Sequence, residues 1–103
     1  MLQTNQTNKL TYKSTLKAYR RLLTANPEKA LDTGNEVIIL HGESLFWSPK
    51  CRDGSIDWNL DSFFDLDESA FDDVNGCWDG DTPENTQASI DSPVFIDVPA
   101  SEE

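Results

Sequence analysis

The sequence predicts an α+β fold in which two N-terminal helices pack on a small antiparallel β-meander. Apolar residues recur at helical spacing in the first quarter of the chain, and β-branched or alternating runs follow up to residue 60. The 103 residues fit one domain, and most large apolar residues, including all three tryptophans, lie between Leu10 and Trp78. We therefore expect a polar N-terminal tail over residues 1–8, a single domain over 9–78 and a flexible acidic C-terminal tail over 79–103.

Two helices are expected before residue 35. In the first, over residues 11–25, tyrosines and leucines recur every three or four positions, and lysines and arginines fill the other faces. Asn26 then offers an N-cap, Pro27 a first helical residue and Glu28 an acid in the first turn. Gly34 supplies a stop signal, so the pattern predicts a short second helix.

Three strands are expected next. The run Val37–Leu40 and the run Leu45–Ser48 flank the turn residues His-Gly-Glu and predict a hairpin. Residues Ile56–Leu60 alternate apolar with polar side chains, which predicts a third strand with one buried and one acidic face. The segment Ser62–Val74 fits a helix slightly better than a strand, and the pattern leaves both open.

The charge is distributed unevenly along the chain. The first 52 residues hold all eight basic residues and four acidic ones, a net charge of +4, whereas the remaining 51 hold 15 acids and no base. The whole chain carries −11 at neutral pH. This asymmetry argues against direct binding of the acidic half to DNA or RNA. The basic helix, with Lys13, Lys17, Arg20 and Arg21, could neutralise part of that half within one chain or across a dimer, but four cations cannot balance fifteen acids.

The stretch Ser55–Val74 alternates aromatic or aliphatic residues with carboxylates and contains no lysine or arginine. Acids two apart on a strand lie ~6.6 to 6.8 Å apart, and acids four apart on a helix rise by ~6 Å, so either structure presents a line of charge. Lysine and arginine rows that grip DNA receive phosphates spaced by ~3.4 Å of helix axis on each strand. The candidate partner-binding residues, here named the acidic ridge, are Asp57, Asp61, Asp65, Asp67, Glu68, Asp72 and Asp73.

In charge pattern the chain resembles the DNA-mimic proteins, many of them small phage products that block restriction enzymes, CRISPR effectors or other nucleic-acid-binding machines. The resemblance implies an inhibitor that covers a basic nucleic-acid-binding surface of a partner protein with the acidic ridge. Two other interpretations stay open. The acids can form an ordinary solvated face, or the protein can be an adaptor or regulatory subunit that binds through its aromatic surface or the apolar segment Val94–Val98.

The residues predict neither an enzyme nor a metal or cofactor site. A calcium loop counted from Asn75 places Thr86 where a bidentate glutamate is needed. His41 is the only histidine and has no nucleophile-elbow or cysteine-protease context. There is no glycine-rich phosphate loop either. We therefore expect function through protein binding.

A cytoplasmic location is expected, because the polar start lacks the apolar run of a secretory signal and no stretch has the length of a membrane span. In a reducing compartment, Cys51 and Cys77 are expected as free thiols, with a disulfide between them as the alternative. The oligomeric state and the identity of the partner stay open.

Overall fold

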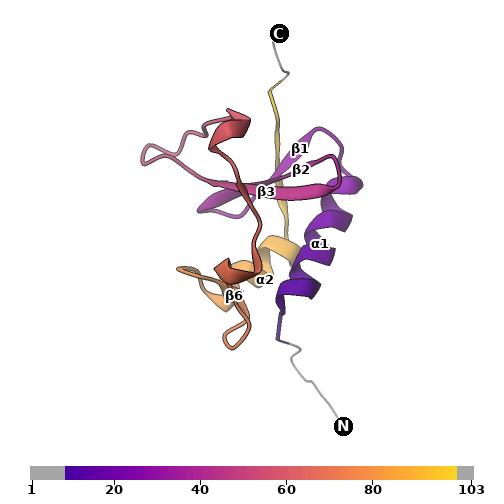
Figure 1. Ribbon diagram of the computed structural model, residues 1–103, viewed down its shortest axis with the longest axis vertical. Helices are drawn as coiled ribbons and strands as arrows, with labels where there is room; N and C mark the ends of the chain where they lie inside the picture. The colour runs from indigo at the N-terminus through magenta and orange to yellow at the C-terminus, as the bar shows by residue number, and fades with distance from the viewer. Residues whose placement is uncertain (1–8, 100–103) are drawn as a thin grey trace.

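The computed structural model describes residues 9–99, which form a five-stranded antiparallel sheet with two helices on one of its faces (Figure 1). The strand order is β4-β3-β2-β1-β7. These strands are β1 (Lys29–Asp32), β2 (Glu36–His41), β3 (Ser44–Pro49), β4 (Phe64–Asp65) and β7 (Val94–Asp97). The predicted α+β class is thus confirmed. The predicted tail over residues 1–8 lies outside the described residues, as do positions 100–103.

Helix α1 (Tyr12–Thr24) confirms the first predicted helix. Thr11 is its N-cap, and its hydroxyl accepts from the backbone N–H of Ser14 while the Ser14 side chain accepts from the backbone N–H of Thr11. This reciprocal capping box satisfies two backbone donors that the first turn would otherwise leave unpaired. Tyr19 and Leu23 lie on the buried face of the helix.

The predicted second helix is wrong, and β1 occupies its place. Asn26 does not begin a helix; its side-chain amide donates to the backbone carbonyl of Leu22 at 2.7 Å and so closes the end of α1. Glu28 then adopts a positive φ of 67°, after which Ala30 and Leu31 are fully buried in β1. A helix of one or two turns is marginal in water. A strand paired on both sides, with β2 and β7, satisfies its backbone and buries both faces.

The predicted hairpin is confirmed by β2 and β3, whose register pairs Ile38 with Trp47 and His41 with Ser44. Alternate residues of the sheet enter two separate cores. On the first face, Leu31, Ile38 and Leu45 pack with residues of α1. The second face carries a smaller cluster of Ala30, Val37, Ile39 and Phe63, with Ile56 and Trp58 packed against it. The uninterrupted apolar run of β2 follows from burial on both faces.

The predicted third strand over Ile56–Leu60 is wrong. Ile56 and Trp58 do pack against the second core. The free edge of β3 pairs with β4, however, so it offers residues 56–60 no strand to pair with. The predicted helix over Ser62–Val74 is also wrong. The single-turn 3₁₀ helix η1 (Leu60–Ser62) ends where that segment begins, and the segment itself contains a second one, η2 (Glu68–Ala70), and two short strands. Like-charged side chains four apart destabilise a helix, and aspartates compete for the backbone in turns.

The prediction of a flexible tail after residue 78 is corrected for residues 83–97. Thr82 caps α2 (Pro83–Asp91), and β7 pairs with β1 along its whole length. The small hairpin of β5 (Phe71–Asp72) and β6 (Cys77–Trp78) leads into α2. The predicted domain bounds of 9–78 thus omit one strand of the central sheet.

Candidate acidic binding surface

The acidic ridge is well exposed. Six of its seven side chains are exposed, and Asp72 is half-buried. None of the seven forms an ion pair with a base in residues 9–99. In that range the two ion pairs are Lys29 with Asp97 and Lys50 with Asp32, the latter at 2.8 Å. The ridge therefore forms no ion pair within the described chain, although the Lys9 ammonium donates to the carbonyl of Val74, the residue after Asp73.

Several ridge carboxylates shape the backbone that carries them. Asp57, Asp67 and Asp72 each accept from the backbone N–H two residues further on, at 3.0, 3.2 and 2.9 Å. These are Asx-turns, which reverse the chain locally without a helix or a long strand. Hydrogen bonds from the Asn59 N–H and the Ser62 hydroxyl lower the pKa of Asp57. The spacing of acids that predicted a helix or a strand thus reflects a succession of turns.

Three ridge acids lie near opposite ends of Tyr12. Asp73 accepts from the backbone N–H of Tyr12, the first residue of the helix, at 3.0 Å. A carboxylate at this end stabilises the helix, because the unpaired N–H groups make it the positive end of the dipole. Burial raises the pKa of Tyr12, and the negative charges of Asp67 and Glu68 add to the rise. Asp73 therefore lies at the backbone of Tyr12, whereas Asp67 and Glu68 lie near its hydroxyl, which donates to the Leu66 carbonyl.

The other ridge residues lie in separate places along the same path. Asp57 and Asp61 share the turn around Asn59, which accepts from the backbone N–H of Asp61 at 3.1 Å. Asp65 lies on the edge strand β4, opposite Phe46 of β3. Figure 1 shows this part of the chain passing beside the sheet toward β6 and α2. The acids thus lie at separate places along the segment that runs from the second core to the first.

Asp72 belongs to a different neighbourhood. Burial raises the pKa of the Cys77 thiol, and the nearby carboxylates of Asp72, Asp81, Asp79 and Glu84 raise it further, in that order. Three of these four acids were not among the predicted site residues. Asp79, Asp81 and Glu84 follow Asp72 by 7, 9 and 12 residues, and this spacing gave no periodic signal. The β5–β6 hairpin is what brings them near Asp72.

Exposed apolar side chains interrupt the acids. The exposed fractions are 50% for Leu60, 54% for Phe64 and 75% for Val74. Phe64 covers one side of Trp47, with 5.2 Å between ring centroids. The ridge is therefore a mixed apolar and acidic surface.

Helix α1 does not neutralise the ridge within residues 9–99. Lys13, Lys17 and Arg21 are exposed and form no ion pair in that range. Arg20 donates to the backbone carbonyl of Glu43 at 2.6 Å, on the turn between β2 and β3. The internal pairing considered from the sequence is thus not seen in this part of the chain, and pairing across a dimer stays a prediction.

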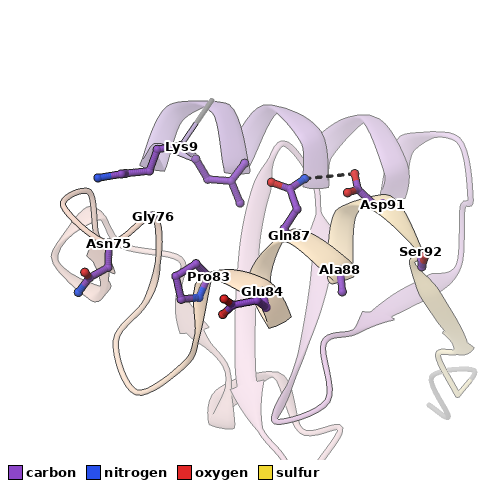
Figure 2. A pocket seen from close by; sticks show the side chains of 10 residues that line it. Lys9, Asn75, Gly76, Pro83, Glu84, Gln87, Ala88, Asp91 and Ser92 are labelled. Carbon is purple, nitrogen blue, oxygen red and sulfur yellow. Dashed lines mark hydrogen bonds between the residues drawn. The ribbon is translucent and has the colours of Figure 1, made fainter. Parts of the chain in front are cut away.

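A groove of about 650 Å³ lies beside α2, between Lys9, the turn at Asn75 and Gly76, and the exposed face of the helix (Figure 2). Gln87 donates to Asp91 across one turn of the helix at 3.1 Å. The groove brings a base, Lys9, together with acids, so it differs in charge from the ridge.

Other candidate sites have little support in the described residues. Over residues 9–99, no three histidine, cysteine, aspartate or glutamate side chains lie close enough to hold a metal ion. Cys51 is exposed, Cys77 is buried and both are free thiols. His41 is exposed and lies edge-on to Phe46, 6.2 Å between ring centroids. In the same range, no helix has the length and apolar character needed to cross a bilayer.

Comparison of the chain with protein-family models, with curated proteins and with solved structures found no match. The function is therefore argued from the charge, exposure and geometry of the surface described above.

Proposed function

We propose that this protein is a non-enzymatic inhibitor that binds the basic nucleic-acid-binding surface of a partner protein through its acidic ridge. The main support is that seven carboxylates, six of them exposed, lie within residues 57–73 and that no base of residues 9–99 forms an ion pair with them. A partner with rows of lysine and arginine supplies the missing counter-charges through charge-assisted hydrogen bonds, which are stronger than neutral ones.

The turns also support this proposal. Asp57, Asp67, Asp72 and Asp73 are held by backbone N–H groups rather than extended freely into solvent. Side chains fixed before binding lose less conformational entropy when the complex forms. The ridge is therefore suited to presenting charge at set positions, as a phosphate backbone does.

The exposed apolar residues distinguish this surface from a merely solvating one. Protein interfaces combine a desolvated apolar or aromatic centre with a polar rim. Leu60 and Phe64 lie between ridge acids in the sequence, Val74 directly follows the last of them, and all three are exposed. An acidic face that served only solubility would gain nothing from exposing them.

The apolar segment of the adaptor interpretation lies within the sheet. The segment Val94–Val98 is not a free tail, because β7 is hydrogen-bonded to β1 and the Val98 N–H donates to the Glu28 carbonyl at 3.2 Å. An adaptor would use the outer edge of β7, with which no strand of residues 9–99 pairs, or the aromatic surface around Phe64. Such binding is less sensitive to salt than the proposed charge contacts.

The test compares two triple variants with equal loss of charge. The ridge variant carries Asp61→Asn, Asp65→Asn and Glu68→Gln. In the parent, the side chains of these three acids accept no hydrogen bond from residues 9–99. The control carries Glu28→Gln, Glu43→Gln and Glu84→Gln, also exposed and free of side-chain hydrogen bonds in that range. Because these six side chains form no hydrogen bond or ion pair in that range, both variants should melt close to the parent, with a small loss from Glu84, which lies in the first turn of α2.

The readout is capture of basic proteins from an extract of the producing cells, at low and high salt, followed by elution with duplex DNA or RNA. Exposed charge pairs are screened over a Debye length of ~8 Å at physiological ionic strength, so capture should fall steeply with salt. Nucleic acid should release the partner. The ridge variant should associate about tenfold more slowly, because steering by opposite charge is reduced. Capture that ignores salt and nucleic acid, or that is equal for the two triple variants, contradicts the proposal.

A further inference from the structure

A small pocket of about 200 Å³ opens between the first face of the sheet and the turns on either side of β5 and β6. Its lining consists of Glu36, Trp47, Leu66, Ala70, Trp78 and Asp79. Two of these residues are tryptophans, two are acids and none is a base. The backbone N–H of Asp79 donates to the carbonyl of Ala70 at 2.8 Å, which joins two parts of the rim.

The aromatic walls of the pocket are held in place. Trp78 stacks on Tyr19 with 6.3 Å between ring centroids and meets Phe71 edge-on at 4.8 Å. Its indole N–H donates to the Tyr19 hydroxyl at 3.0 Å. Trp47 is half-buried and packs against Phe64. A group that enters the pocket therefore meets indole surfaces whose positions are already set.

The acidic part of the lining lacks a counter-charge. Glu36 is half-buried, and its Oε1 accepts from the Thr33 hydroxyl at 2.9 Å, whereas its other oxygen accepts no hydrogen bond from residues 9–99. Burial raises the pKa of Glu36; the Thr33 hydrogen bond opposes the rise, and the charge of Asp81 adds to it. Asp79 is exposed, and its side chain forms no ion pair in the described range. A cation in the pocket would relieve the repulsion between these carboxylates.

We propose that this pocket receives an arginine side chain of the partner protein, stacked on the half-buried Trp47 and hydrogen-bonded to Glu36. The volume is below the ~300 Å³ at which small-molecule sites begin, and so suits a single side chain. A cation over an indole face is attracted by the ring quadrupole. The planar guanidinium stacks on aromatic rings and donates two parallel hydrogen bonds to a carboxylate, which an ammonium group cannot do.

This inference rests on the proposed function, because it names the anchor through which a basic partner would be held next to the acidic ridge. The pocket opens beside Leu66 and Ala70, between ridge residues in sequence. A partner that covers the ridge with arginine-rich rows thus has a side chain of the right chemistry close to the opening.

The test uses the full chain and needs no partner. Titration with N-acetyl-arginine amide is followed through the three indole N–H signals in a ¹H–¹⁵N NMR spectrum, assigned with Trp47→Phe and Trp58→Phe. N-acetyl-citrulline amide is the matched ligand, since it keeps the shape and removes the charge. Arginine should shift the Trp47 or Trp78 signal saturably with a dissociation constant on the order of 1 mM. With the citrulline ligand, any shift of the Trp47 and Trp78 signals should stay linear in ligand concentration and not saturate. The Trp58 signal should not move with either ligand.

Glu36→Gln should weaken arginine binding about tenfold, while Glu84→Gln, which removes an exposed acid outside the pocket, should leave it unchanged. The glutamine keeps an oxygen that can accept from Thr33, so the fold should hold. If Glu36→Gln does not fold, Asp79→Asn replaces it with the same expected direction. Equal binding of citrulline, no saturable shift, or undiminished binding by the acid variants overturns the proposal. Tighter binding of N-acetyl-trimethyllysine amide than of the arginine ligand overturns the choice of arginine.

The two proposals fail separately. If the arginine ligand does not bind but partner capture is weaker in the ridge variant than in its control, the ridge stands and the pocket does not. If the ligand binds but the two triple variants capture equally, the pocket is a cation site unrelated to a nucleic-acid-binding partner.

Discussion

The indole N–H of Trp78 donates to the hydroxyl of Tyr19 at 3.0 Å, joining the centre of α1 to a residue 59 positions later in the chain. Both side chains are buried, and the Tyr19 hydroxyl also lies 3.3 Å from that of Ser89 in α2. This contact ties together three segments that are far apart in the sequence. It also orients one wall of the proposed arginine pocket.

Tyr19→Phe should destabilise the protein by about 1 to 3 kcal/mol, because the buried indole N–H of Trp78 loses its acceptor. Thermal melts measure the effect, and each kcal/mol corresponds to a fall in Tm of roughly 4–8 °C for a domain of this size. Tyr12→Phe removes a hydroxyl that donates to the Leu66 carbonyl at 2.6 Å in a half-buried setting, and serves as the comparison. A loss for Tyr19→Phe no larger than for Tyr12→Phe would show that the buried contact carries little stability.

Strand β7 should contribute to the stability of the domain. Ile96 is half-buried against the second core, whereas Val94 in the same strand is 55% exposed. Ile96→Ala should cost about 2 kcal/mol, near the lower end for removing buried aliphatic groups, and Val94→Ala less than about 0.5 kcal/mol. Urea unfolding of both variants provides the measurement. Equal and negligible effects would mean that the C-terminal segment is a flexible tail after all.

Two glycines with nearly the same φ provide a matched pair. Gly76 has φ 78° and Gly80 has φ 80°, so alanine is strained at both by about 1 to 2 kcal/mol. A Cβ at Gly76 would also lie 2.6 Å from Cγ of Lys9 and 3.3 Å from the backbone of Leu10, whereas one at Gly80 meets nothing within 4 Å. Gly76→Ala should therefore lower the melting temperature more than Gly80→Ala. The reverse order would argue against close packing of the start of α1 on this turn.

Glu36 should make the fold less stable as pH rises. Burial raises the pKa of Glu36, so the folded state holds this proton at pH values where the unfolded chain, with a pKa of about 4.3, has lost it. The stability contribution of this group therefore falls as pH rises from the unfolded pKa through the folded one. Glu36→Gln should be more stable than the parent at pH 7, and the gap should close near pH 4. Urea unfolding at both pH values checks this, and a variant that is less stable at pH 7 would refute it.

Local patterns were sufficient where short-range chemistry decides the structure. The helical spacing of tyrosines and leucines over residues 11–25 predicted α1, and the turn residues from His41 to Glu43 predicted the β2–β3 hairpin. The Thr-Pro-Glu sequence at residues 82–84 is an equally local signal for the start of α2. The polar composition of the surrounding residues predicted a flexible tail instead. The exposure of the ridge acids likewise follows from composition, since unpaired carboxylates are costly to bury.

The sequence by itself determined the α+β class, the first helix, the central hairpin and an exposed surplus of negative charge. Tertiary structure decided that residues 29–32 form a strand, because only β2 and β7 together supply partners for both edges of β1. It also decided that the ridge acids occupy turns, since the free edge of β3 accepts only the two residues of β4. The pocket beside Trp47 and Trp78 depends on contacts between residues more than 30 positions apart, and no local pattern encodes such contacts.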